Sequence, residues 1–392
     1  MHKNFYLILT PLFLLLMAWG VHHNKPQAPA ATSIIAQGYG GPIEMSLTVS
    51  AQGTIEELKV LRHNETTSYI NRLDGFLKQF IGRTRKNSFI IGQDIDAISG
   101  ATITSTAITR ALKEKMNMTA PHENTSPNPL MPVVIPTALF LLATFALFAR
   151  HPALRWAALA GGFVYFGIIT HTMLSIIQIT QTGLNHTPHF DLNPLGLVLL
   201  TLTFISAIVV GRIYCGSLCP FALIQEILFY LKPHKHPLTE HVDPLTDRTI
   251  RLTKYALLFM ITGLCFILGN ASAANIEPFI TLFAGHGSKL AWSLLTLMLI
   301  MAVFNFRFWC KYLCPVGALT GLAATFSLNK IRPNTTCTAC GTCSKICPTQ
   351  AISIDPQGAP VIDPAECISC TKCLRACPVN ALTFGCHGHE KK

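Results

Sequence analysis

The sequence predicts a polytopic α-helical membrane protein with about six crossings, placed between an extracytoplasmic α+β domain and a cytoplasmic cysteine-rich domain. Half of the 392 residues are hydrophobic and only 12% are charged, a composition unlike that of soluble domains. All 14 cysteines lie after residue 214. The apolar stretches are close to the roughly 20 residues that cross a bilayer core, and they cover 5–21, 130–149, 154–177, 194–211, 254–270 and 289–306.

The basic residues predict the orientation of the chain. The short loops 178–193 and 271–288 contain no Lys or Arg, whereas the loops on the other side carry many. Because cytoplasmic loops are enriched in basic residues, we expect the N-terminus in the cytoplasm and residues 22–129 outside it, in a cell inner membrane. The net charge of +11 then reflects topology and contact with anionic lipid, and no nucleic-acid motif accompanies it. The basic loops lie around 150–155, 212–254 and 307–333.

These patterns divide the chain into five parts. Ala28-Pro29-Ala30 is a candidate cleavage site for a signal peptide, but the preceding polar stretch is long for that purpose, so an uncleaved anchor fits better. The expected parts are a signal-anchor helix and linker (1–31), an extracytoplasmic domain (32–118), a linker (119–129), a transmembrane domain (130–333) and a cytoplasmic domain with a tail (334–392).

Eight cysteines near the C-terminus repeat one pattern. The spacing C-x2-C-x2-C-x3-C-P occurs twice, at Cys337, Cys340, Cys343 and Cys347, and again at Cys367, Cys370, Cys373 and Cys377. Two such runs are the bacterial ferredoxin signature of two [4Fe–4S] clusters, in which the fourth cysteine of each run ligates the other cluster. Zinc sites and a disulfide framework are the alternatives, but zinc sites seldom space four cysteines so tightly. We therefore expect one cluster on Cys337, Cys340, Cys343 and Cys377, and the other on Cys367, Cys370, Cys373 and Cys347.

Two further cysteine pairs follow the fourth and sixth apolar stretches. Cys215 and Cys219, and then Cys310 and Cys314, each form C-x3-C-P after an arginine, which indicates an internal repeat at the cytoplasmic edge. Cysteines four residues apart share one face of a helix, so both pairs can converge on one centre. Two interpretations stay open: four thiolates around a further Fe–S cluster or metal, or unligated cysteines that pack as small apolar side chains. A stable disulfide is excluded in the cytoplasm.

The extracytoplasmic part contains a segment suited to a phosphate group. Ile43, Met45, Leu47 and Val49 alternate with polar residues, as in a half-buried strand. Apolar residues at helical spacing follow the segment 96–105, which places it at a helix N-terminus. There the unpaired N–H groups and the positive end of the helix dipole favour phosphate. Ser-Gly-Ala-Thr is also an ordinary helix cap, so both interpretations stay open.

This segment resembles the flavinylation motif Asp-x-x-Ser/Thr-Gly-Ala-Thr of the FMN-binding domains in Rnf and Nqr complexes and in NosR-type proteins. The resemblance implies that a flavin transferase joins FMN through a phosphoester to the last threonine, with Thr104 as the second candidate. Glu65 and Thr66 also resemble that domain. The residues that match the motif are Asp96, Ser99, Gly100, Ala101 and Thr102.

The doubled C-x3-C-P motif before a two-cluster ferredoxin module resembles the NosR/NirI family, and NapH proteins share this portion. The resemblance implies a redox carrier or quinol-dehydrogenase-like subunit rather than a stand-alone enzyme. Electrons would pass between a cytoplasmic donor or quinol and an extracytoplasmic acceptor that serves a periplasmic or extracellular reductase. His171, in the third apolar stretch, is a candidate for quinol or proton binding or for a plain interhelical hydrogen bond. A redox-sensing regulator or a maturation factor of a periplasmic reductase is the alternative that the same resemblance implies.

Overall fold

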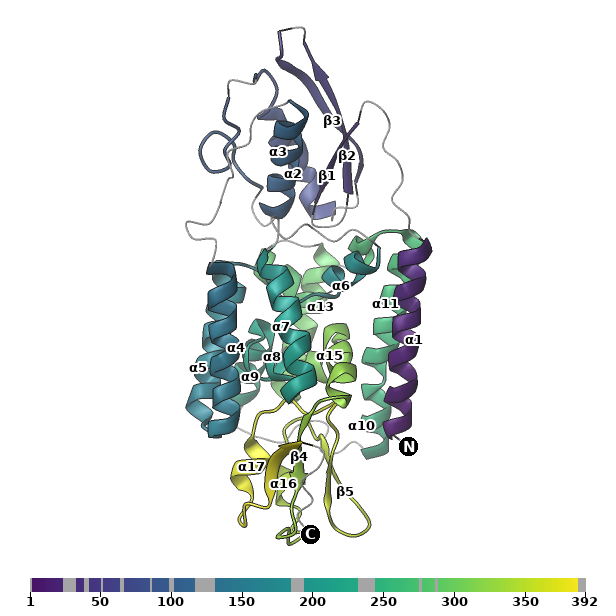
Figure 1. Ribbon diagram of the computed structural model, residues 1–392, viewed down its shortest axis with the longest axis vertical. Helices are drawn as coiled ribbons and strands as arrows, with labels where there is room; N and C mark the ends of the chain where they lie inside the picture. The colour runs from purple at the N-terminus through teal and green to yellow at the C-terminus, as the bar shows by residue number, and fades with distance from the viewer. Residues whose placement is uncertain are drawn as a thin grey trace.

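Three parts follow one another along the long axis of the computed structural model (Figure 1). A small α+β domain occupies one end, apolar helices form the middle, and a cysteine-rich domain occupies the other end, where both termini lie. We call the end of the helices next to the α+β domain the upper end and the opposite one the lower end. The structure describes residues 2–23, 33–38, 42–50, 52–63, 67–84, 87–98, 102–116, 131–184, 194–231, 244–274, 277–285 and 288–386.

The α+β domain packs helices on a three-stranded antiparallel sheet of order β1-β2-β3. The predicted alternation is confirmed in β2, where Ile43 and Met45 are fully buried, although Val49 at the end of the strand is exposed. Ile108 and Leu112 of α3 lie in the same core. The elements are β1 (Ser33–Gln37), β2 (Pro42–Val49), β3 (Ile55–His63), α2 (Thr67–Lys78) and α3 (Thr102–Lys115).

Each of the six apolar stretches contains helix, and among the described residues four helical segments are long and apolar enough to cross a membrane. These segments are Phe5–His22, Met131–Ala149, Pro152–Ile169 and Thr246–Leu268. The fourth and sixth stretches form α7 (Pro194–Val210) and α13 (Lys289–Phe304), of 17 and 16 residues, so the count of six crossings stays a prediction. The helices that contain the long segments are α1 (His2–His23), α4 (Met131–Ala149), α5 (Pro152–Gly162) with the π-helix η1 (Phe163–Ile169), α10 (Pro244–Arg251) and α11 (Thr253–Leu268).

The third apolar stretch is not one helix. The helix ends at Ile169, and Thr170 to Ser175 have no helical structure. The chain becomes helical again in α6 (Ile176–Gly183). Near α6, the segment after α11 forms the short η3 (Ala271–Ala274) and α12 (Pro278–Ala284). The upper half of the helical region therefore contains broken rather than continuous helices.

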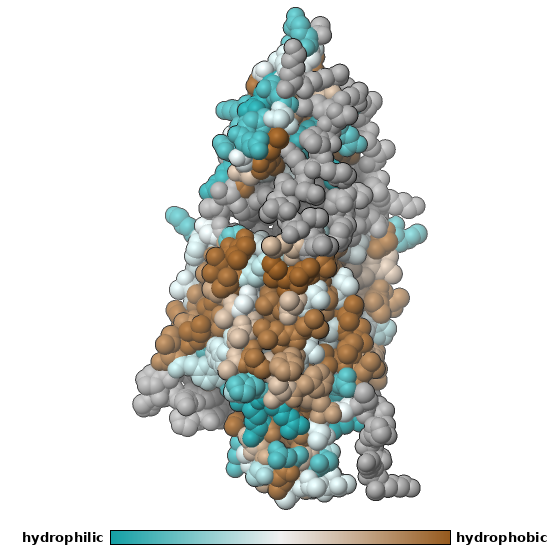
Figure 2. Space-filling view, turned by 60° about the vertical axis from the view of Figure 1, so that its left-hand side comes forward, coloured by the Kyte–Doolittle hydropathy of each residue, from teal (hydrophilic) through white to brown (hydrophobic). Residues whose placement is uncertain are grey.

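One face of the helical region is apolar at its middle height (Figure 2). Figure 2 shows a hydrophobic belt there, with hydrophilic residues concentrated toward the two ends. Among the exposed apolar side chains of α4 and α11, Leu141, Phe145 and Ile267 are 65%, 62% and 74% exposed. A belt of this size is far more apolar than the surface of a soluble monomer, and it fits contact with lipid.

The internal repeat is visible as two broken helical units. In each unit, a long helix ends in a turn with positive φ, a five-residue helix follows, and a third helix begins with proline. The turn residues are Gly211 (φ 92°) and Arg307 (φ 52°). In the same relative position, the amides of Cys219 and Cys314 donate to carbonyl oxygens five residues earlier, both at 2.9 Å. The units are α7, α8 (Ile213–Ser217) and α9 (Pro220–Leu231), and α13, α14 (Phe308–Tyr312) and α15 (Pro315–Thr325).

The cysteine-rich domain also has two matching halves, and it is joined to the first helix. Its halves place α16 (Thr342–Ile346) before β5 (Ile352–Ile354) and α17 (Lys372–Ala376) before β7 (Leu382–Cys386). The hydroxyl of Tyr6 in α1 donates to Asp363 of this domain at 3.2 Å. The remaining strands are β4 (Asn329–Pro333), which pairs with β7, and β6 (Pro360–Ile362), which pairs with β5.

Candidate metal and flavin sites

The first predicted set of four cysteines surrounds one cavity. Cys337, Cys340 and Cys343 of the first run line it together with Cys377 of the second run. The remaining lining is mostly apolar, and the empty volume is about 350 Å³. The structure thus brings together the residues that the sequence pattern groups.

The second predicted set surrounds a cavity of similar size, about 330 Å³. Its cysteines are Cys367, Cys370, Cys373 and, from the first run, Cys347. Within the described residues, no three His, Cys, Asp or Glu side chains converge closely enough to hold a single metal ion. Zinc needs its thiolates about 2.3 Å from one ion, whereas four cysteines around an open cavity fit a [4Fe–4S] cluster.

The two loops around these cavities have matching backbone geometry. Ala339 and Ser369 have φ of 54° and 53° at the same position of each run, which is uncommon for residues other than glycine. The amides of Ala351 and Ala381 donate to the fourth sulfur of each run, at 3.3 and 3.2 Å. Hydrogen bonds to cluster sulfurs are among the features that set a cluster's potential.

The two cavities differ in their access to solvent. Cys340 of the first cavity is exposed, and hydrogen bonds from Thr342 lower the pKa of its thiol. In the second cavity, burial raises the pKa of Cys373 to about 12 and that of Cys367 well above its usual value. Since the ligand form of cysteine is the thiolate, Cys367 and Cys373 would need the charge of a bound cluster to ionise at neutral pH.

The C-x3-C-P cysteines lie among the helices. Phe279 of α12, which follows the upper loop, belongs to the same apolar cluster as Cys219, Cys310 and Cys314. α8 and α14 are short helices followed by α9 and α15, which an apolar run cannot reveal, and the position at the cytoplasmic edge stays a prediction. Cys215 is 9% exposed, and the other three cysteines are partly buried.

Positive charge surrounds these four cysteines. Arg307 is 1% exposed, forms a 2.5 Å ion pair with Glu226, and donates to the carbonyls of Cys215 and Gly216. Arg155 shares the same Glu226 carboxylate at 2.5 Å. Arg212 is also buried, and its Nε and Nη2 atoms have no hydrogen-bond partner in the described part of the chain. A buried excess of positive charge is costly unless negative charge offsets it, and a four-thiolate Fe–S cluster supplies that charge.

The second cavity lies directly against the first C-x3-C-P loop. A Cβ atom added to Gly216 would lie 1.9 Å from the carbonyl oxygen of Ile368, so only glycine permits this contact. Gly216 follows Cys215, and Ile368 follows Cys367. Arg212 donates to the carbonyl of Ala365 at 2.7 Å, which fixes the same loop on the helices.

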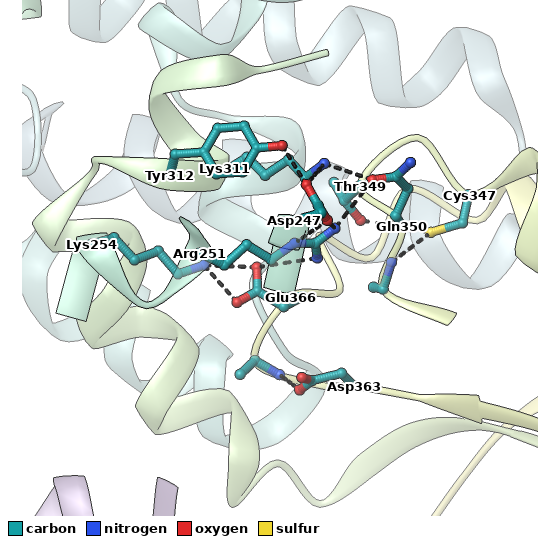
Figure 3. A network of polar contacts seen from close by, with 12 residues as sticks. Asp247, Arg251, Lys254, Lys311, Tyr312, Cys347, Thr349, Gln350, Asp363 and Glu366 are labelled. Carbon is teal, nitrogen blue, oxygen red and sulfur yellow. Dashed lines mark hydrogen bonds and ion pairs between the residues drawn. The ribbon is translucent and has the colours of Figure 1, made fainter. Parts of the chain in front are cut away.

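An ion-pair network holds the second cavity in place (Figure 3). Lys254 of α11 contacts both carboxylate oxygens of Glu366 at 2.7 Å, directly before Cys367. Lys311 and Arg251 donate to Gln350 at 2.7 and 3.3 Å, three residues after Cys347. Asp247 pairs with Arg251 at 2.5 Å and with Lys311 at 2.9 Å, and it accepts from Tyr312 at 2.5 Å. Sequence patterns did not single out Glu226, Gln350 or Glu366.

The flavin motif lies at a helix start, as predicted, because α3 begins at Thr102. Thr104 is 2% exposed and lies in the domain interior. Asp96 is exposed, and its backbone exchanges hydrogen bonds of 2.8 and 3.1 Å with the side chain of Gln79. His171 is exposed beyond the end of η1, with φ of 48°. The residues outside the described part are Ser99, Gly100, Ala101, Glu65 and Thr66.

Comparison with known families agrees with these sites. A model described as an FMN-binding domain matches residues 38–117. A 4Fe-4S binding domain model matches twice, at 192–237 and 290–334, once for each broken helical unit. A 4Fe-4S dicluster domain model matches 336–381. The chain combines an FMN-binding domain with 4Fe–4S domains.

Similar proteins share parts of this NosR-like flavo-iron-sulfur arrangement. The ferredoxin-type protein MauN of methylamine utilization in Paracoccus denitrificans is 31% identical over 43% of this chain and 59% of its own length. The regulatory protein NosR of Pseudomonas aeruginosa is 28% identical over 57% of this chain and 34% of its own length. The putative electron transport protein YccM of Escherichia coli is 30% identical over 39% of this chain and 46% of its own length. No solved structure matches the chain.

Proposed function

We propose that this protein passes electrons across a cell membrane, between Fe–S clusters at the cytoplasmic lower end and a covalently bound FMN at the extracytoplasmic upper end. The donor is a cytoplasmic protein or a quinol, and the acceptor serves a periplasmic or extracellular reductase. A [4Fe–4S] cluster supplies a one-electron carrier whose potential, across proteins, spans about −700 to +450 mV. The protein is thus a redox carrier in the lipid bilayer, with no role for nucleic acid.

One contact carries this proposal: the approach of Gly216 to Ile368. It sets the second cysteine cavity against the C-x3-C-P cysteines, so three four-cysteine sites follow one another. The first has the exposed Cys340, the second is more buried, and the third lies among the helices. Electrons enter at the first site and pass through the second site to the C-x3-C-P site among the helices.

At the upper end we assign Thr102 as the residue that a flavin transferase modifies. Thr104 is the weaker candidate because its side chain is 2% exposed, which leaves an enzyme no access to its hydroxyl. The helix start at Thr102 offers unpaired N–H groups to the FMN phosphate. The hydrocarbon core is about 30 Å thick, so a gap remains between the C-x3-C-P cysteines and the flavin. A bound quinol, a partner's cofactor or approach of the FMN domain completes the path.

The proposal is tested by flavin reduction in sealed proteoliposomes, with a low-potential donor added only on the ferredoxin side. We expect FMN absorbance to bleach in the unmodified protein and to stay constant in Cys370→Ser, which keeps its FMN but lacks the second cluster. Equal bleaching in both proteins would contradict the proposed order. Bleaching that requires added quinone would assign the upper half of the path to quinol.

A second candidate function is a redox-sensing regulator or maturation factor of a periplasmic reductase. It is favoured by the name of the relative NosR, a regulatory protein that aligns with 57% of this chain. A sensor would accept electrons once per chain and then change its binding to a partner. Continuous turnover with a soluble electron acceptor would instead support the carrier.

A further inference from the structure

Glu277 is an isolated carboxyl group in the upper half of the helical region. Between Lys254 and Lys289 it is the only Asp, Glu, Lys or Arg residue in the sequence. It immediately precedes α12, and only 1% of its surface is exposed. A carboxyl group buried among apolar segments is costly to keep unless it has a function.

The contacts of this carboxyl group are incomplete. Oε2 accepts hydrogen bonds from the hydroxyl of Ser175 and, at 3.3 Å, from the amide of Ile176 at the start of α6. Oε1 is buried and has no hydrogen-bond partner among the described residues. Within the same residues, no Lys, Arg or His forms an ion pair with it. A carboxyl group in this setting is poised between its charged and neutral forms.

Burial raises the pKa of Glu277 to about 8, although the hydrogen bonds from Ser175 and Ile176 partly oppose the shift. The group therefore gains and loses a proton close to neutral pH. By contrast, Glu226 in the same protein has two arginine partners. These two glutamates differ in their neighbours, because among the described residues Glu277 has no basic partner.

Two contacts connect Glu277 to the C-x3-C-P cysteines. The hydroxyl of Tyr214, which precedes Cys215, accepts from the amide of Leu174 at 3.2 Å, next to Ser175. The ring of Phe279 in α12 lies 6.0 Å from that of Phe221, two residues after Cys219. The apolar clusters that include Phe279 and Ile280 of α12, next to Glu277, contain among their titratable side chains Tyr214 on α8, Cys219, Cys310 and Cys314 of the repeat, and Cys265 on α11.

We propose that Glu277 is a proton-binding site coupled to the C-x3-C-P centre, an inference that rests on the proposed function. When the centre gains one electron above about pH 8, the Glu277 carboxylate would bind one proton from water. When the electron leaves toward the flavin, the carboxyl group releases that proton. Negative charge added in a poorly solvated site is strongly unfavourable unless it is compensated, and protonation of this carboxylate compensates it.

The test is a redox titration of the solubilised full-length protein at several pH values, monitored by EPR. Below about pH 8 the carboxyl group is protonated in both redox states, so the midpoint potential of the C-x3-C-P centre is flat. Above it, reduction takes up a proton, and the midpoint potential falls by up to about 59 mV for each tenfold decrease in proton concentration. Glu277→Gln mimics the protonated form, so we expect the low-pH potential at every pH.

Ser175→Ala provides a second variant that keeps the carboxyl group. It removes a hydrogen bond that favours the carboxylate, so the onset of the slope should move to higher pH. The two ferredoxin clusters in each sample serve as internal controls, and their pH profiles should not change. In addition, the infrared absorbance of a protonated carboxyl group should titrate in the unmodified protein and be missing in Glu277→Gln, independently of the clusters.

The outcomes separate this inference from the proposed function. Loss of the slope in Glu277→Gln, with its shift in Ser175→Ala, supports the inference. An EPR signal from the C-x3-C-P centre with the same slope in both the unmodified protein and Glu277→Gln overturns the role of Glu277 alone. Absence of that signal, with iron confined to the ferredoxin domain, overturns the three-site path of the proposed function.

Discussion

Gly216 and Thr102 are the single residues on which the proposed electron path depends. Gly216 lets the carbonyl of Ile368 approach the backbone beside Cys215, and no side chain fits there. Thr102 lies at the first turn of α3, where a phosphate group finds unpaired amides. Each residue yields a test that leaves the rest of the protein intact.

Gly216→Ala should push the loop at Ile368 away from α8, because the new Cβ would otherwise lie 1.9 Å from a carbonyl oxygen. We expect the magnetic interaction between the second ferredoxin cluster and the C-x3-C-P centre to weaken in EPR, with unchanged iron content. Gly263→Ala is the matched control, because its Cβ meets nothing within 4 Å. An unchanged interaction in Gly216→Ala would remove this contact from the electron path.

Thr102→Ala should abolish covalent flavin fluorescence on a denaturing gel, since the hydroxyl that forms the phosphoester is gone. Thr104→Ala should retain it, because Thr104 is buried at 2% exposure. The reverse result would move the attachment site by two residues. Circular dichroism of both variants checks that the domain still folds.

At the scale of elements, the broken units α7–α8–α9 and α13–α14–α15 decide whether a third cluster exists. Replacement of Cys215 and Cys310 by serine removes one ligand from each unit. We expect iron to fall from about twelve to about eight atoms per chain, the content of two [4Fe–4S] clusters. Iron of about eight in the unmodified protein would instead mean that these cysteines only pack. Cys265→Ser, at a cysteine outside both motifs, should leave the iron content unchanged.

Part of this architecture follows directly from the sequence. The apolar stretches predict helices because a helix needs about 20 residues to cross a bilayer, and the cysteine spacing predicts which residues share each cavity. The breaks in the helices are not predictable in the same way, because Thr170–Ser175 belong to one continuous apolar stretch of the sequence. There, tertiary contacts such as the Leu174 amide with Tyr214 determine where the helix ends.

The ion pairs between buried charged residues could not be predicted from the sequence either. Arg155, Glu226 and Arg307 lie in three different segments, and only folding brings them together. Glu277 left a weaker signal that could have been found, because a lone acid in a long uncharged stretch is unusual. Its contact with Ser175, however, joins residues 102 positions apart.

At the scale of the whole molecule, α1 is part of the fold rather than only an anchor. Tyr6 and Phe13 are buried in the main apolar core, and Tyr6 reaches the ferredoxin domain. Replacement of α1 by an unrelated membrane-spanning helix should preserve insertion. It should lower the thermal midpoint by several degrees and make the C-terminal domain easier to cleave by protease.

The control for this replacement is a second foreign helix that keeps Phe5, Tyr6, Phe13 and Gly20 at their positions. Gly20 is included because a Cβ there would lie 2.8 Å from the ring of Phe266. We expect this helix to restore both properties. Equal stability of the two replacements would show that α1 contributes only its hydrophobicity.

The hydrogen bond between Tyr6 and Asp363 also constrains how the protein is made. Its partners are 357 residues apart. At a synthesis rate of about 5–20 residues per second, Asp363 is therefore made roughly 20 to 70 s after Tyr6. During that time the lower end of the helices is not covered by the C-terminal domain. Translation of the segment around Asp363 lets the domain cover it, and a ribosome that stalls before this segment leaves a chain in which Arg212 lacks its contact with the carbonyl of Ala365.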